Sequence, residues 1–245
     1  MPKAIIIGCS SGIGRALAKK MAHEGYEIGL AGIDEPALKS LQQEIPTKTW
    51  ISVIDVTQTE QAINQLNGLI AQMGGIDVGF ISAGVGIINE ELDWNKEKTT
   101  IEVNVLGFNA MAVTFMHHFY QKKSGHLVAI SSIAALAGSP TAPAYNASKA
   151  YISNYLQGLQ KKVFQDNLPI AITDIMPGFV DTAIAQGPNL FWVAPVEKAA
   201  NQIYDAIKKK KHHAYITKRW RLIAWGIKLA PHWLYARIRQ HSFGS

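Results

Sequence analysis

Tyr145 and Lys149 are the two residues whose types and spacing most directly suggest chemistry. They lie near the start of a segment of helical period that spans residues 143–166, so a separation of four places both side chains on one face. A cation close to a phenol favours the phenolate and lowers its pKa from about 10 towards neutral pH. The pair predicts a tyrosine that exchanges a proton with a carbonyl or hydroxyl oxygen. Taken alone, this spacing also fits an ordinary surface pair on a helix.

A glycine-rich loop, Gly8-Cys9-Ser10-Ser11-Gly12-Ile13-Gly14, follows the first apolar run and precedes a helical segment. Glycines permit a tight turn and a close approach of the backbone to a pyrophosphate. A helix N-terminus adds free N–H groups and the positive end of the helix dipole. The position of the loop after a first strand favours a dinucleotide site over a turn without a ligand.

The elements that must position these residues follow from an alternation of short apolar runs with helical segments. We expect strands at residues 4–8, 27–31, 49–54, 78–82, 126–131 and 170–175, with a last one around Tyr215 and Ile216. We expect helices at residues 13–24, 36–44, 58–73, 96–121, 143–166 and 196–208. This order predicts an α/β fold, a doubly wound parallel sheet with helices on both faces. Its ligand site should lie beyond the carboxyl ends of the strands.

Three further segments follow other expected strands: Asp55-Val56-Thr57, Ser82-Ala83-Gly84, and Pro177-Gly178 with Asp181-Thr182. Together with the glycine spacing G-x-x-x-G-x-G, they resemble the short-chain dehydrogenase/reductase family over nearly the whole chain. The resemblance implies a Rossmann-type oxidoreductase that transfers a hydride between NAD or NADP and a carbonyl or hydroxyl group.

The resemblance also implies roles for single residues. Ser132 matches the serine that holds the substrate oxygen beside Tyr145, Lys149 the lysine that binds the nicotinamide ribose, and Asn104 the asparagine of a proton relay. No metal site is expected, because His117 and His118 have no carboxylate or cysteine at ligand spacing. The expected cofactor contacts are Gly8, Ser10, Ser11, Gly12, Ile13, Gly14, Asp34, Asp55, Val56, Ser82, Ala83, Gly84, Tyr145, Lys149, Pro177, Gly178, Val180 and Thr182.

Two positions depart from the family pattern. Ile7 stands where the family usually has Thr before the first glycine, and Ser82 replaces the Asn of its N-A-G element. A hydroxyl is shorter than an amide and cannot donate and accept through separate atoms. We expect these changes to affect local bracing more than cofactor binding.

The choice between NAD and NADP depends on residues 32–35, where the family's usual acid is Gly32 and its usual Arg is Ile33. The absence of a basic residue at position 33 and the acid Asp34 favour NAD. Arg15 would favour NADP if its side chain folded over the pocket. The choice stays open.

Composition excludes several classes of protein. With 48% hydrophobic and 17% charged residues, the chain is globular rather than disordered. The single cysteine, Cys9, excludes an intramolecular disulfide and fits a reducing, cytoplasmic location, where we expect it to be a small buried filler. No apolar stretch reaches the roughly 20 residues needed to span a bilayer.

The net charge of +6 is concentrated in the last 40 residues. We expect residues 1–217 to form one catalytic domain. We expect 218–245 to be a basic, aromatic-rich extension that packs on the domain, on a neighbouring subunit or on a membrane surface. Nucleic-acid binding is not expected, because no stacking platform or reading motif accompanies the charge.

Residues 179–195 lie where the family selects its substrate, and their apolar side chains fit a lipophilic small molecule. Alternatively, Phe191 and Trp192 pack on the domain edge. The resemblance suggests a homodimer or homotetramer built on helices 96–121 and 143–166. The rival to an enzyme is a dinucleotide-binding scaffold or peripheral membrane protein that acts through the basic tail, but the intact Tyr145 and Lys149 favour the enzyme.

Overall fold

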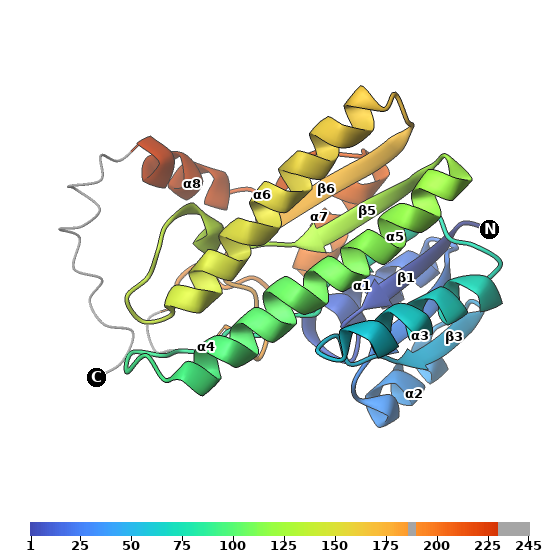
Figure 1. Ribbon diagram of the computed structural model, residues 1–245, viewed down its shortest axis with the longest axis horizontal. Helices are drawn as coiled ribbons and strands as arrows, with labels where there is room; N and C mark the ends of the chain where they lie inside the picture. Colours follow the sequence, from blue (N-terminus) through green and yellow to red (C-terminus); the bar gives the residue numbers. More distant parts are fainter. Residues whose placement is uncertain (186–189, 230–245) are drawn as a thin grey trace.

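The computed structural model describes residues 1–185 and 190–229. One sheet of seven parallel strands has the order β3-β2-β1-β4-β5-β6-β7 (Figure 1). The strands are β1 (Lys3–Ile7), β2 (Glu27–Gly32), β3 (Thr49–Val53), β4 (Val78–Ile81), β5 (Gly125–Ile130), β6 (Ile170–Pro177) and β7 (His213–Ile216). The helices are α1 (Gly12–His23), α2 (Glu35–Glu44), α3 (Thr59–Gln72), α4 (Trp94–Ile101), α5 (Phe108–Lys122), α6 (Pro143–Gln165), α7 (Val196–Lys208) and α8 (Trp220–Leu229). The predicted doubly wound fold is confirmed.

The helices form two layers, with α3, α5 and α6 on one side of the sheet and α1 and α7 on the other (Figure 1). Because successive side chains of a strand point to opposite faces, Ile5 and Ile7 of β1 join the core under α3 and α5, whereas Ile6 joins the core under α1 and α7. All three isoleucines are fully buried. Such continuous apolar runs are required of parallel strands that are covered on both faces.

Of the helices predicted from the sequence, the one at 96–121 is the only one that is not a single α-helix in the structure. It consists of α4, a π-helical segment at Glu102–Gly107 and α5. A π segment widens one turn of a helix and is common at functional sites. Asn104 lies inside it.

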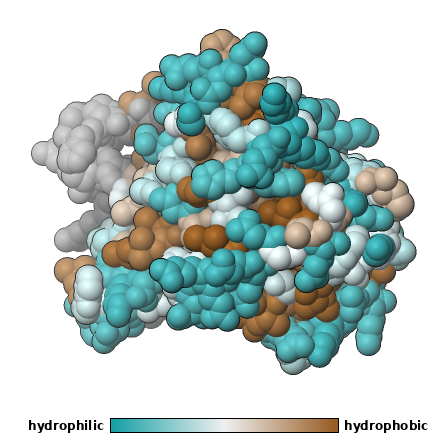
Figure 2. Space-filling model, turned by 45° about the vertical axis from the view of Figure 1, so that its right-hand side comes forward, coloured by the Kyte–Doolittle hydropathy of each residue, from teal (hydrophilic) through white to brown (hydrophobic). Residues whose placement is uncertain are grey.

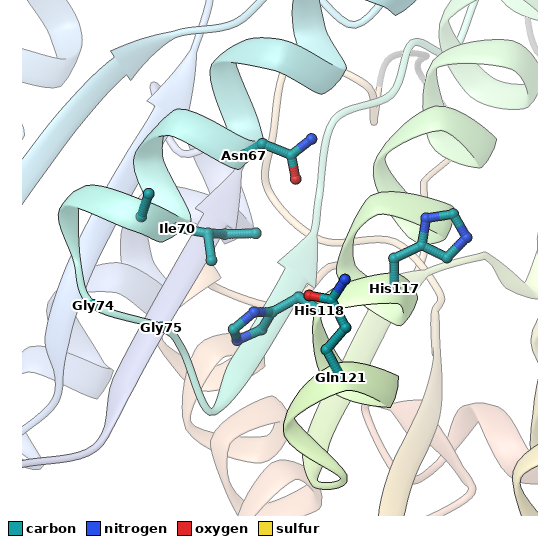
Figure 3. Close-up of a pocket in the computed structure, with 8 residues that line it drawn as sticks. Asn67, Ile70, Gly74, Gly75, His117, His118 and Gln121 are labelled. Carbon is teal, nitrogen blue, oxygen red and sulfur yellow. The ribbon is translucent and has the colours of Figure 1, made fainter.

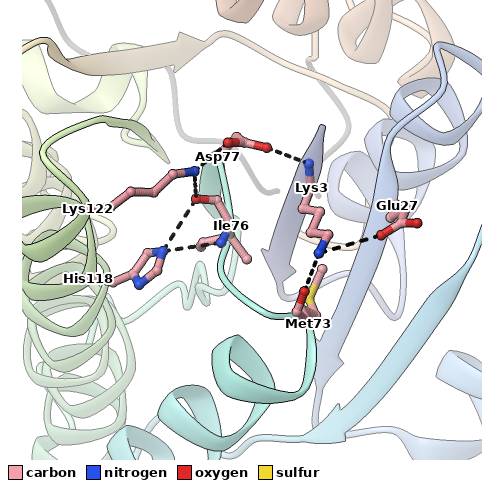
Figure 4. Close-up of polar contacts among 7 residues, drawn as sticks. All are labelled: Lys3, Glu27, Met73, Ile76, Asp77, His118 and Lys122. Atoms are coloured by element: carbon pink, nitrogen blue, oxygen red, sulfur yellow. Dashed lines mark hydrogen bonds and ion pairs between the residues drawn. The ribbon is translucent and has the colours of Figure 1, made fainter. Parts of the chain in front are cut away.

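At the amino edge of the sheet, charged groups are paired with one another and with the backbone (Figure 4). Asp77 accepts a hydrogen bond from the backbone N–H of Lys3 at 2.8 Å and forms an ion pair with Lys122. Lys122 also donates to the carbonyl of Ile76, and the His118 ring accepts from the Ile76 N–H. These bonds join β1, the residues that precede β4, and α5 at the amino edge of the sheet.

The described part of the C-terminal extension folds back onto the domain. Trp220, which begins α8, is 2% exposed and lies flat against Gly178. Its ring contacts Phe179, Phe191 and Trp192 at centroid distances of 5.4, 5.2 and 6.0 Å. Phe191 and Trp192 therefore pack together at the domain edge. The rest of the extension, residues 230–245, lies outside the described residues.

Candidate active site

The glycine loop joins β1 to α1 and forms a tight turn. Gly8 has a φ of +84°, and a Cβ added to Gly14 would lie 2.2 Å from the Gly8 carbonyl oxygen. Gly8 also passes so close to β4 that a Cβ there would lie 2.5 Å from the Ala83 nitrogen. No side chain fits at either position, so the turn requires the two glycines.

The loop has the properties of a phosphate site. Ser11, the N-cap of α1, makes no side-chain capping bond, which leaves N–H groups of the first turn free for an anion. The buried hydroxyl of Ser10 has no hydrogen-bond partner among the described residues. A buried hydroxyl without a partner is costly unless a ligand or water completes it. The residues present therefore fit a dinucleotide.

The rest of the expected cofactor site lies along the same edge. Backbone N–H groups of Ser82 and Ala83 donate to the Ile7 carbonyl at 2.8 and 3.0 Å, which braces β4 against the loop even though Ser82 replaces an asparagine. Thr182 approaches from the other side, since a Cβ on Gly12 would lie 3.2 Å from its methyl group. Val180 is buried and bridges to Ala194.

Asp34 and Asp55, which the sequence predicts to contact the cofactor, follow β2 and β3 along this edge. The Asp34 carboxylate caps α2 by accepting from the Ala37 N–H at 2.9 Å. Asp55 accepts from the N–H and hydroxyl of Thr57. Both carboxylates are exposed. Each stabilises its own turn or helix end through the hydrogen bonds just described. Val56 is buried and packs on Gly107.

Tyr145 and Ser132 are brought together as predicted. Ser132 follows β5 and caps the short 3-10 helix Ile133–Leu136, because its hydroxyl accepts from the Ala134 N–H at 3.1 Å. Tyr145, in the first turn of α6, is hydrogen-bonded to the Ser132 side chain. Burial raises the pKa of the Tyr145 phenol above its ordinary value, although this hydrogen bond opposes the change.

Lys149 lies one turn further along α6 and is 4% exposed. Its ammonium donates to the Ile130 carbonyl at 3.2 Å and lies 5.8 Å from the centre of the Tyr145 ring. Burial lowers the pKa of Lys149 to about 8, against the charge of Asp174, which raises it. The expectation that Lys149 lowers the pKa of Tyr145 is wrong for this structure. The ammonium is directed to a backbone carbonyl, and burial dominates at the phenol.

Asn104 is fully buried, and both ends of its amide are used. Its oxygen accepts from the Val85 N–H at 2.9 Å, and its nitrogen donates to the Val85 carbonyl at 2.8 Å and to the Ser148 hydroxyl at 3.0 Å. A Cβ on Gly84 would lie 3.2 Å from the Asn104 oxygen and 3.4 Å from the Lys149 nitrogen, so the two heads converge there. The structure therefore brings Asn104, Ser132, Tyr145 and Lys149 together.

Two features of this region were missed by the sequence analysis. A Cβ on Gly86 would touch both Ile184, at 2.6 Å, and the Tyr145 ring, at 3.5 Å, so Gly86 leaves room for an apolar side chain beside the phenol. Behind the site, the buried Asp174 binds the hydroxyls of Ser131 and Ser153. No sequence signal pointed to this carboxylate, because its partners come from distant parts of the chain.

A hollow of about 490 Å³ lies on another part of the molecule, between α3 and α5 at the amino edge of the sheet (Figure 3). His117 and His118 both line the hollow, and His117 is exposed. Burial lowers the pKa of His118, which favours the neutral ring that accepts from Ile76. Over residues 1–185 and 190–229, no group of three or more His, Cys, Asp or Glu is placed to hold a metal.

Cys9 is fully buried, and its thiol contacts the Ala31 carbonyl. Burial raises the pKa of the thiol to about 12, which disfavours the reactive thiolate. The prediction of a buried filler is confirmed.

The short chain dehydrogenase family model matches residues 2–192. An uncharacterized oxidoreductase of Staphylococcus epidermidis is 31% identical over 206 residues, which cover 83% of this chain and 88% of the relative. The 3-oxoacyl-(acyl-carrier-protein) reductase of Chlamydia muridarum is 33% identical over 190 residues, covering 75% and 76% of the two chains.

Solved structures show the same fold. A short-chain dehydrogenase/reductase from Burkholderia phymatum in complex with NAD has a TM-score of 0.82 and 21% identity, and the match covers 91% of this chain and 92% of that one. A short-chain dehydrogenase from Sphingobium yanoikuyae in complex with NADPH has a TM-score of 0.80 and 20% identity, with 99% and 98% covered. This chain belongs to the short-chain dehydrogenase/reductase family and is an NAD(P)-dependent oxidoreductase.

Proposed function

We propose that this oxidoreductase reduces a carbonyl, or oxidises an alcohol, of an apolar small molecule with Tyr145 as its general acid/base. The observation that carries the proposal is the hydrogen bond between Tyr145 and Ser132 in a site that also holds the buried Lys149. Two hydroxyls that share one hydrogen bond can both reach a single substrate oxygen.

In the direction of reduction, a nicotinamide held by the glycine loop would supply the hydride. The Ser132 hydroxyl holds the substrate oxygen and stabilises the charge that develops on it. Tyr145 gives its proton to that oxygen, and the hydrogen bond with the Ser132 side chain stabilises the phenolate that remains. Asn104 binds the backbone of Val85 and the Ser148 hydroxyl, which in turn donates to the Tyr145 carbonyl. Through these bonds it holds the Val85 backbone and the first turn of α6 in position.

The groups near the adenosine ribose support a preference for NAD. Arg15 donates to the Ala37 carbonyl at 3.1 Å and pairs with Glu44, so its guanidinium is bound to α2. Ile33 is 72% exposed and carries no charge. The 2′-phosphate of NADP would be repelled by Asp34, and no unpaired cation among the groups named here would neutralise it. The ribose 2′-hydroxyl of NAD, in contrast, can donate to a carboxylate.

The side chains above the phenol support an apolar substrate. Ile184 lies against Gly86 beside the Tyr145 ring, and Val85 and Ile87 are partly buried in the same loop. Apolar side chains beside two hydroxyls suit a lipophilic ketone, aldehyde or secondary alcohol.

The test is calorimetric titration of the purified protein with NAD, NADH, NADP and NADPH at one salt concentration, followed by a carbonyl and alcohol screen with the tighter cofactor. We expect NAD and NADH to bind more tightly and a lipophilic substrate to turn over. Tighter binding of NADP would overturn the proposed preference for NAD. If the folded protein bound none of the four dinucleotides, the proposed enzymatic function would be overturned.

A second proposal concerns the described part of the extension, where α8 supports peripheral binding to an anionic membrane. Leu222, Trp225 and Leu229 are 66%, 51% and 82% exposed and lie at helical spacing along one stripe. The flanking Lys218, Arg219 and Arg221 are exposed, and no Asp or Glu follows Asp205 in the chain. An apolar stripe with tryptophan and flanking cations is typical of helices that lie in a membrane interface.

Sedimentation with vesicles tests this proposal. We expect binding to anionic vesicles and little to zwitterionic ones, and a loss of binding in a Leu222→Ser, Trp225→Ser double variant. Phe164→Ser is the matched control, because Phe164 is 85% exposed near the end of α6. Equal sedimentation of the double variant and the control would refute the membrane contact. Among the described residues, no helix is both long and apolar enough to cross a bilayer.

We also propose a single catalytic domain over residues 1–217, a cytoplasmic location and a homodimer or homotetramer. Exposed Leu106, Val113 and Tyr151 on the π segment, α5 and α6 support an assembly through these helices. Figure 2 shows separate apolar patches in a mostly hydrophilic surface. Sedimentation velocity of the protein checks the oligomer.

A further inference from the structure

Asp174 on β6 is a carboxylate that no step of the proposed reaction uses. It is 4% exposed, and three polar side chains from three elements surround it. The Ser131 hydroxyl, after β5, donates to Oδ1, and the Ser153 hydroxyl of α6 donates to Oδ2 at 2.7 Å. Nδ1 of His213 on β7 lies 3.6 Å from Oδ2. A carboxylate with two short hydrogen bonds is held in one orientation.

Two of these three elements carry the catalytic residues. Ser131 directly precedes Ser132, and Ser153 lies one helical turn beyond Lys149 on α6. The carboxylate of Asp174 therefore joins the end of β5 to α6 beside the catalytic residues. A relative shift of these two elements would separate Ser132 from Tyr145, and small misplacements of reacting groups are expensive in rate.

Asp174 also supplies charge. The buried ammonium of Lys149 donates to a neutral carbonyl, that of Ile130, and forms no ion pair within 4.0 Å in the part of the chain that the structure describes. Burying a cation is costly unless an anion is near. The charge of Asp174 opposes the effect of burial on Lys149.

We propose that Asp174 is a positioning residue that fixes β5 against α6 and keeps the Lys149 ammonium charged. This inference rests on the proposed function for its effect on turnover, but its effect on Lys149 exists without substrate or cofactor. The titratable groups that face Asp174 are Lys149 from α6 and His213 from β7, and β5 contributes the uncharged Ser131.

The test is a carbon NMR titration of the lysine side chains in cofactor-free protein, with the Lys149 signal assigned by its loss in Lys149→Arg. We expect a midpoint near 8 in the unchanged protein. In Asp174→Asn, which keeps the shape and removes the charge, we expect the midpoint to fall by about one pH unit. Asp174→Ser serves the same purpose if the asparagine variant does not fold.

Two variants separate charge from geometry. Ser153→Ala removes one hydrogen bond and keeps the carboxylate, so we expect an unchanged midpoint and a kcat lower by about fivefold, the equivalent of one hydrogen bond. His213→Asn removes the other titratable neighbour and should not lower the midpoint. A midpoint that falls in Asp174→Asn but not in His213→Asn assigns the effect to the carboxylate.

An unchanged Lys149 midpoint in a folded Asp174→Asn protein would overturn the electrostatic role, and full turnover of Ser153→Ala would overturn the geometric one. Failure of the proposed function has a different signature, since Tyr145→Phe would then retain its turnover while the Lys149 titration could still be read.

Discussion

The amino and carboxyl edges of the same sheet use polar residues in different ways. At the amino edge, Asp77, Lys122 and Lys3 are paired with each other or with the backbone, and His118 accepts from a backbone N–H. At the carboxyl edge, the Ser10 hydroxyl has no partner among the described residues, and the buried Lys149 binds a neutral carbonyl. The charged groups at the amino edge are therefore paired within the protein, whereas the Ser10 hydroxyl and the Lys149 ammonium at the carboxyl edge remain available to a ligand.

This comparison shows why a site can be recognised before its ligand is known. Buried polar groups cost free energy when they lack partners, so such groups beside a glycine-rich turn and a helix N-terminus point to a ligand that supplies the bonds. The hollow beside His118 is larger than a water molecule, yet the His118 ring that lines it is already bonded to the backbone of Ile76. Volume alone is therefore a poor guide to function in this protein.

The largest expected effect is at Tyr145. Tyr145→Phe removes the proton that the carboxyl edge gives to the substrate, so we expect kcat to fall by about 10²-fold to 10⁴-fold. Tyr151→Phe, six residues further along α6, is the matched control, and its turnover should change little. Steady-state kinetics measures both, and equal rates for the two variants would contradict the assignment.

The glycine loop gives the next largest effect. In Gly14→Ala the added methyl group would lie 2.2 Å from the Gly8 carbonyl oxygen, so we expect a loss of about 1–3 kcal/mol in stability and weakened dinucleotide binding. Gly68→Ala in α3 is the control, because no atom lies within 4 Å of the added carbon. The control should gain about 0.5–1 kcal/mol. Urea unfolding and cofactor titration check both, and unweakened binding in Gly14→Ala would mean that the loop is not the phosphate site.

The pH dependence of kcat/KM for the cofactor should reveal Lys149. Its pKa of about 8 in the cofactor-free protein means that the ammonium is charged below this pH and lost above it. We therefore expect kcat/KM for the cofactor to be constant at neutral pH and to fall by about tenfold per pH unit above the pKa of Lys149. Lys149→Arg keeps its charge over this range, so its profile should lack the fall. A fall that remained in this variant would assign it to another group.

The smallest effect is expected at the amino edge. Burial raises the pKa of Asp77, but hydrogen bonds from Lys122 and the Lys3 N–H outweigh this and hold it below its usual value. A depressed pKa stabilises the fold above the unfolded-state pKa, and the stabilisation is lost as pH falls through the folded-state value. Asp77→Asn should cost about 1 kcal/mol at neutral pH. The cost should vanish in strong acid, and kcat should be unchanged. Urea unfolding at the two pH values checks this, and a large loss of kcat would show that the edges are not independent.

Most of the fold was predictable because its signals are local. The boundaries expected for β2, α6 and α7 agree with the structure within two residues, since apolar periodicity and glycine turns act over short distances. The glycine loop and the spacing of Ser132, Tyr145 and Lys149 likewise act over short distances and point to the candidate site. The π segment around Asn104 was not predictable, because its sequence has the same apolar period as an ordinary helix.

The sequence by itself determined the alternation of strands and helices along the chain, the glycine turn proposed to hold the dinucleotide and the residues proposed to exchange the proton. Only the tertiary structure decided how these groups ionise and what supports them. Burial raises the pKa of Tyr145 and lowers that of Lys149, and Asp174 meets Ser131 and Ser153 from 43 and 21 positions away. Desolvation and charge pairing depend on what packs around a group in space, and spacing along the chain does not record that.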